Sequence, residues 1–134
     1  MIPIIISFLV LITTSYTDIK ENIIPNKHLI IALILGIVWV TLNNSFMPSL
    51  LHGFIALIIF YILYKIKVFC EGDAKLLTII CFLNPSIIFI FIIFILSGIF
   101  LGLYGFATKT KHSFYAPFVL ISYTIITITT ILIK

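Results

Sequence analysis

The sequence contains no arginine, and its eight lysines and four acidic residues amount to only 9% of 134 residues. A water-soluble domain of this size carries roughly 25% charged residues, because a small globule is mostly surface that water must hydrate. Hydrophobic residues make up 63% of the chain, and the mean hydropathy is +1.36. The composition therefore excludes a separate water-soluble catalytic domain. We expect the chain to lie in a lipid bilayer and to bind no nucleic acid.

Cysteine and histidine are also scarce. The two cysteines, Cys70 and Cys81, lack the Cys-x-x-Cys spacing, and the three histidines are scattered along the chain. Structural and catalytic zinc sites need clusters of such residues. We therefore expect no metal site and no cofactor, and we interpret both cysteines as small apolar fillers of the core.

Long apolar runs fill the rest of the chain. We interpret them as helices, because lipid offers no partner to the backbone groups of an open strand. Five runs approach the length of about 20 residues that crosses a bilayer, and a sixth is too short. The expected ranges are 2–17, 27–42, 50–69, 85–108 and 114–133, with the short helix at 74–84. The prediction is one all-α domain over residues 1–134, a polytopic membrane bundle of about six helices.

Helix starts give three further expectations. No basic segment precedes the first apolar run, so we expect a membrane span there rather than a cleaved signal peptide. Asn26 is predicted as the N-cap of the second helix. Asn84 and Pro85 are predicted as the N-cap and the first-turn proline of the fifth helix.

The few charges gather in short connections between the apolar runs. With six helices, three of these connections lie on one side of the membrane and hold seven of the eight lysines. Lysine near span ends marks the cytoplasmic side. All four acidic residues fall in two of the same connections. The sequence therefore predicts a multi-pass protein of the inner, cytoplasmic membrane, with its acidic residues at the cytoplasmic face.

Two of these acids, Asp18 and Asp73, are candidate catalytic residues. Asp18 is predicted at the C-terminal end of the first helix, where the helix dipole disfavours a carboxylate. Asp73 is predicted at the N-terminal end of the short helix, where it is favoured and could serve as a cap. If the two meet in a partly desolvated site, they share one proton, and such a pair can activate water for attack on a peptide bond.

Nearby residues are predicted to support this site. Gly72 frees the backbone just before Asp73. Pro25 ends an extended segment before Asn26 and so directs the chain back to the bilayer. Lys75 either lowers the pKa of Asp73 or extends its ammonium group to the membrane surface.

At these residues the sequence resembles the type IV prepilin peptidases, which are intramembrane aspartic proteases. DIKENIIPN (18–26) is similar to the family's first motif, an aspartate followed seven residues later by the proline of Ile-Pro-Asn. EGDAKLL (71–77) is similar to the second motif, GxGD followed by Lys-Leu-Leu. FYAPF (114–118) resembles a weaker third segment, Pro-aromatic-small-Pro, which contributes Pro117. Cys70 stands in place of the first glycine of GxGD, and Phe114 in place of the first proline.

The resemblance implies cleavage of a prepilin leader peptide at the cytoplasmic face by Asp18 and Asp73. The chain lacks the paired-cysteine loop of the long members, so it is similar to the short, peptidase-only forms of Flp/Tad-type pilus systems. A pilin-like precursor is the implied partner, and action alone or as a homodimer is left open. A non-enzymatic alternative is also left open: a small ion-conducting protein or an assembly scaffold for pili or secretion. A hydrophobic substrate segment is expected to approach sideways through lipid, with the short helix leaving polar space beside Asp73.

Overall fold

The computed structural model describes residues 2–21, 23–67, 70–108 and 115–132. For residues 87 and 105–108 it describes the backbone but not the side chains. These residues form six helices and no strand, which confirms the prediction of an all-α protein with about six helices. The helices are α1 (Ile2–Glu21), α2 (Asn26–Leu42), α3 (Phe46–Lys65), α4 (Glu71–Leu83), α5 (Ile87–Thr108) and α6 (Tyr115–Leu132).

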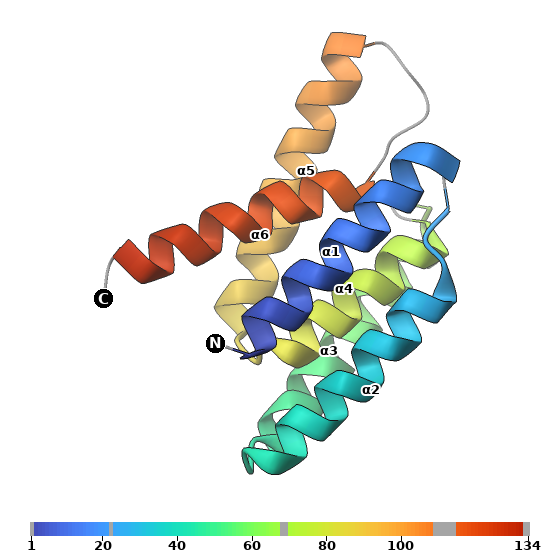
Figure 1. Cartoon of the computed structure of the whole chain (residues 1–134). Helices are drawn as coiled ribbons and strands as arrows, with labels where there is room; N and C mark the ends of the chain where they lie inside the picture. Colours follow the sequence, from blue (N-terminus) through green and yellow to red (C-terminus); the bar gives the residue numbers. More distant parts are fainter. Residues whose placement is uncertain (1, 22, 68–69, 109–114, 133–134) are drawn as a thin grey trace.

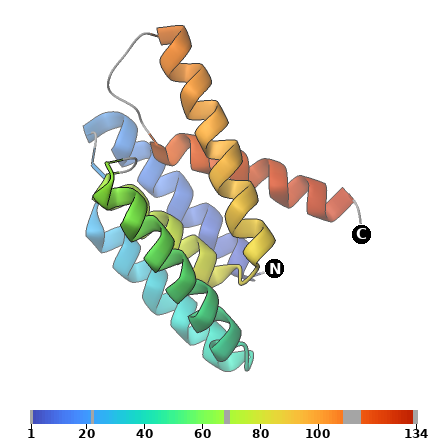
Figure 2. The ribbon, with the colours of Figure 1, turned by 180° about the vertical axis from the view of Figure 1, so that it is seen from behind.

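Helices α1 to α4 lie side by side and alternate in direction, whereas α5 and α6 cross them obliquely (Figure 1, Figure 2). As a result, one end of the bundle brings together the C-terminal ends of α1 and α3 and the N-terminal ends of α2, α4 and α6. We call this the active-site end, because both candidate aspartates lie there. All five lysines in the described part of the chain lie at this end: Lys20, Lys27, Lys65, Lys67 and Lys75.

Three helices, α1, α3 and α6, are long and apolar enough to cross a membrane. Helix α2, with 17 residues, and the Ile88–Tyr104 part of α5 are apolar but shorter. Helix α4 has 13 residues, and at 1.5 Å per residue it is about 20 Å long, too short to span the hydrocarbon core. The short helix predicted after the GxGD-like segment is therefore present, and it lies among the longer ones.

Helix α4 is the centre of the core. Leu76, Leu77 and Ile80 have no exposed surface, and α2 and α3 pack against the same helix. Gly36 of α2 and Gly53 of α3 allow this close approach, because a Cβ atom at Gly36 would lie 2.8 Å from a side-chain carbon of α4 and one at Gly53 3.0 Å. Small residues at helix contacts are typical of membrane bundles, where close packing drives helix association.

The outward faces of the helices are apolar. Large hydrophobic side chains are exposed on every helix except α4, and Leu42 and Leu132 are exposed to 75% and 78%. Monomeric water-soluble proteins rarely expose contiguous apolar surface on this scale. A surface of this kind suits contact with lipid chains, in agreement with the composition.

Two predicted helix starts are wrong. Helix α2 begins at Asn26 itself, and the N-cap residue is Pro25 in extended conformation, with no side-chain cap. Asn84 ends α4 rather than starting α5, because its N–H donates to the carbonyl of Ile80. Helix α5 begins after Ser86, whose Oγ accepts the N–H of Phe89 at 3.4 Å. The Asn26 side chain accepts a hydrogen bond from Lys75 far along the chain. The Asn84 side chain donates both to the Ile80 carbonyl of α4 and to Ser7 of α1.

Candidate active site

Asp18 lies in the last turn of α1, as predicted, and is 7% exposed. Its Oδ2 accepts a hydrogen bond of 3.0 Å from the backbone N–H of Ala116, and the backbone N–H of Tyr115 also donates to the carboxylate. Both donors belong to the first turn of α6. The N-terminus of one helix therefore offsets the unfavourable dipole at the C-terminus of another, and the carboxylate is held in a fixed position.

The first turn of α6 is itself anchored. The hydroxyl of Tyr115 lies 2.7 Å from Oγ of Ser97 on α5, and both side chains are buried. Pro117 lies in the first turn, where its missing N–H would have no helical partner, so it favours the start of α6 at this point. Phe114, the first residue of the third motif-like segment, lies outside the described residues.

Asp73 is the third residue of α4 and is 8% exposed. Its Oδ2 accepts the backbone N–H of Cys70 at 3.2 Å, and the Cys70 side chain accepts the backbone N–H of Asp73 in return. This reciprocal arrangement is a capping box, so Asp73 does act as a cap. Cys70 has φ −77°, an ordinary extended value, so the backbone is not strained by a cysteine here. Cys70 stands at the position of the first glycine of the GxGD motif.

The two carboxylates are close enough for their charges to interact. Burial raises the pKa of Asp73 to about 7, the hydrogen bond from Cys70 opposes this rise, and the negative charge of Asp18 adds to it. The pKa of the Cys70 thiol is also raised, first by burial and then by the charges of Asp73 and Asp18. The structure therefore brings together the two acids that the sequence predicted as a pair.

Gly72 and Pro25 act on the same junction. Gly72 lies inside the first turn of α4 and its φ is not positive, so its predicted role in backbone freedom is wrong. Its small size matters instead, because a Cβ atom there would lie 3.0 Å from Cβ of Ile24. Ile24 is buried, and the extended Pro25 that follows it leads the chain into α2. This contact joins the two motif-like segments to one another.

Lys75 does not pair with Asp73. Its Nζ contacts Oε1 of Glu71 at 2.5 Å and Oδ1 of Asn26 at 3.4 Å, at the exposed rim of the active-site end. The hydrogen bond from Lys75 lowers the pKa of Glu71. Of the two alternatives predicted for Lys75, the structure does not support a lowered pKa of Asp73, because the exposed side chain binds Glu71 and connects α4 to α2.

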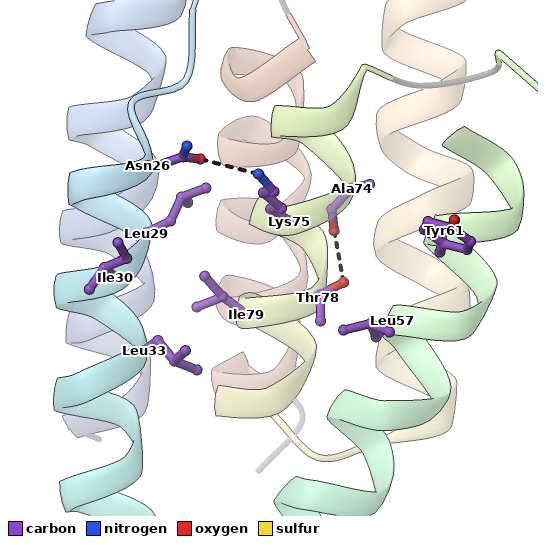
Figure 3. A pocket seen from close by; sticks show the side chains of 10 residues that line it. All are labelled: Asn26, Leu29, Ile30, Leu33, Leu57, Tyr61, Ala74, Lys75, Thr78 and Ile79. Atoms are coloured by element: carbon purple, nitrogen blue, oxygen red, sulfur yellow. Dashed lines mark hydrogen bonds between the residues drawn. The ribbon is translucent and has the colours of Figure 1, made fainter. Parts of the chain in front are cut away.

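An open groove of about 570 Å³ runs beside α4, between α2 and α3 (Figure 3). Its lining is almost entirely apolar, and Asp73 does not line it, so polar space beside Asp73 stays a prediction. Asn26 and Lys75 stand at one end of the groove, and neither aspartate lines it. The lining residues are Asn26, Leu29, Ile30, Leu33, Leu57, Tyr61, Ala74, Lys75, Thr78 and Ile79.

Fold and site together define a class: an all-helical membrane protein with two buried aspartates at one end of the bundle, close enough for their charges to interact. Residues 5–106 match the sequence model of the type IV leader peptidase family, which is more than half of the chain. The chain belongs to this family, and it is therefore a peptidase by descent. No curated protein and no solved structure matches the chain. The match ends before α6, so it does not include Pro117 or the donors to Asp18.

Sequence reasoning missed Ser97 and the use of the α6 backbone. Ser97 is a single small polar residue in an apolar run, and nothing in its spacing distinguishes it from a packing residue. The N–H groups that hold Asp18 belong to the backbone, so no side-chain pattern records them. The one available signal was the third motif-like segment, which marks the start of α6 without revealing its partner.

Proposed function

We propose that this protein is an aspartic endopeptidase in which Asp18 and Asp73 activate water to cleave the leader peptide of a pilin-like precursor. The observation that carries this proposal is the pairing of two buried carboxylates, each fixed by backbone N–H groups at a helix start. In the described residues no cluster of three or more histidine, cysteine or acidic side chains is arranged to hold a metal ion.

The surroundings favour different roles for the two acids. Asp18 receives two backbone hydrogen bonds from the first turn of α6, whereas Asp73 receives one from Cys70, and such bonds stabilise the ionised form. Asp73 is buried and has a pKa of about 7, so it holds a proton over much of the neutral range. We assign Asp18 as the general base and Asp73 as the general acid.

The reaction then balances without a covalent intermediate. Asp18 takes a proton from water as the water oxygen bonds to the peptide carbonyl carbon, and Asp73 gives its proton to the carbonyl oxygen. When the C–N bond breaks, the proton held by Asp18 passes to the leaving amine. The carbonyl reforms and returns a proton to Asp73, so both acids regain their starting states.

The position of the site supports cleavage at the cytoplasmic face. The active-site end carries all five lysines of the described residues, and lysine near span ends is typical of the cytoplasmic side. Lys109 and Lys111, which belong to the same prediction, lie outside the described residues. We propose a precursor with a basic leader, from a pilus system of the Flp/Tad type.

The apolar groove offers a surface for the hydrophobic segment of such a precursor. It faces outward between α2 and α3, and its lining residue Ala74 is adjacent to Asp73 in the first turns of α4. A segment lying there would reach the active-site end past Lys75 (Figure 3). Single cysteines at Leu33 and Leu57 would then cross-link to the precursor, and cross-links confined to α5 and α6 would contradict this route.

The decisive test is cleavage of a co-expressed prepilin by variants of the acidic residues. Asp18→Asn and Asp73→Asn are expected to abolish leader removal, because each removes one proton carrier. Glu21→Gln and Glu71→Gln make the same carboxylate-to-amide change at exposed positions nearby and are expected to retain it. Cleavage that survives either aspartate change, in protein inserted normally, would remove the pair from the mechanism.

The pH dependence of the rate gives an independent test. The proposed acid must carry its proton, and its pKa is about 7. The rate of cleavage in detergent micelles is therefore expected to fall as the pH rises through about 7. A rate that stays constant from pH 6 to pH 9 would contradict the assignment of Asp73 as the acid.

A further inference from the structure

Ser15 of α1 carries a buried hydroxyl that has no hydrogen-bond partner among the described residues. The residue is 6% exposed, and in the part of the chain that the structure describes only its Oγ and Nδ1 of His28 are buried side-chain atoms in this situation. Leaving a buried polar group unpaired costs free energy, so each such group calls for an explanation.

The neighbours of Ser15 show that the missing bond is not forced by the helix. Hydroxyl groups in helices commonly donate to a carbonyl three or four residues earlier. Thr13, Thr14 and Thr17 of α1 all do so, with Thr14 donating to Val10 at 2.7 Å. Ser15 instead keeps its hydroxyl free of its own helix, which leaves it available to another group.

Ser15 stands one helical turn before Asp18, on the same buried face of α1. Residues three apart on a helix have Cβ atoms about 5–6 Å from each other. A water molecule that makes hydrogen bonds of about 2.8 Å to both side chains fits this separation. Thr14, the other buried hydroxyl within one turn of Asp18, has its donor committed to its own helix.

We propose that Ser15 is a positioning residue that holds the attacking water against Asp18. This inference rests on the proposed function. It adds a contact with Ser15 to the contacts that the water makes with Asp18 and with the peptide carbonyl. The O–H of Ser15 donates to one lone pair of the water oxygen and the Asp18 carboxylate accepts a hydrogen of the water, so the second lone pair of the water oxygen is left to face the peptide carbonyl. Ser15 neither gains nor loses a proton in the reaction.

Ser15→Ala separates this role from a purely structural one. If the hydroxyl holds the water, kcat falls about tenfold or more while KM stays the same. The free energy of unfolding in micelles does not fall, because the substitution removes a buried polar group that has no partner. Ser122→Ala is the matched control, since that hydroxyl is equally buried but donates to Phe118 within its own helix. The control is expected to retain the wild-type kcat. Unchanged kcat in Ser15→Ala would overturn the inference.

Inhibitor binding provides a second measurement that does not depend on turnover. In a hydroxyethylene peptide analogue of the precursor, the hydroxyl takes the place of the water. Ser15→Ala is expected to weaken binding of this analogue about tenfold and to leave binding of its deoxy counterpart unchanged. Equal affinities of Ser15→Ala and wild type for the hydroxyl analogue would overturn the role of Ser15 but not the proposed function. A wild-type protein that does not prefer the hydroxyl analogue would overturn the proposed function as well.

Discussion

Replacing Asp73 by asparagine is expected to stabilise the protein at alkaline pH while it abolishes cleavage. The pKa of Asp73 is raised from 3.8 to about 7, mainly because burial disfavours the charged form. At 1.36 kcal/mol per pKa unit, this rise corresponds to about 4 kcal/mol. The amide of asparagine has the same shape, carries no charge and can still accept the N–H of Cys70.

The sign follows from the direction of the shift. A carboxyl group whose pKa is higher in the folded chain contributes its stabilisation in full below about pH 4, where both states are protonated. The contribution is lost as the pH rises through about 7. The free energy of unfolding of the wild type is therefore expected to fall by up to about 4 kcal/mol between pH 4 and pH 8. Asp73→Asn is expected to lack this fall.

The assay is denaturant unfolding in detergent micelles at several pH values, for the wild type, Asp73→Asn and Glu71→Gln. Glu71 is an exposed acid two residues earlier, and its pKa is lowered by Lys75 rather than raised, so it controls for the loss of an acid on the same helix. Equal pH slopes for the wild type and Asp73→Asn would refute the reasoning, because Asp73 would then be no harder to ionise in the folded chain.

Two further predictions concern the supports of the site. Gly72→Ala places a Cβ atom 3.0 Å from Cβ of Ile24 and is expected to cost about 1–3 kcal/mol in thermal or denaturant unfolding. Gly98→Ala, with nothing within 4 Å, is expected to be neutral or stabilising, and equal costs for the two would contradict this explanation. Tyr115→Phe removes the hydroxyl that meets Ser97 and is expected to lower kcat about tenfold with little change in KM, since the first turn of α6 holds the base less firmly. An unchanged kcat in steady-state cleavage would contradict this anchoring role.

The sequence predicted most of what depends on composition and spacing. Apolar runs separated by short charged or polar connections were enough for six helices, because so apolar a chain has few places to turn. The pairing of Asp18 with Asp73 also followed, since alternating helices return both acidic segments to one end. These features are properties of whole segments, and they do not depend on the placement of single atoms.

The wrong or missed predictions concern groups whose partners lie far away in the chain. Asparagine is a preferred helix N-cap, yet Asn26 binds Lys75, 49 residues away. Asn84 caps the end of α4 through the Ile80 carbonyl rather than the start of α5, and it also binds Ser7, 77 residues away. Local preference is a weak guide when a side chain can satisfy a tertiary partner instead. The donors to Asp18 were missed for a related reason, because they are backbone groups 98 residues away.

That same separation sets the order in which the site is completed during synthesis. Asp18 leaves the ribosome early, but the N–H of Ala116 that binds it is made 98 residues later. At about 5–20 residues per second, this delay is roughly 5–20 s. Until α6 has been inserted, the carboxylate at the end of α1 lacks the donors that fix it. In the proposed mechanism, a nascent chain therefore lacks a fixed general base until α6 is in place, and it is not expected to cleave neighbouring membrane proteins before then.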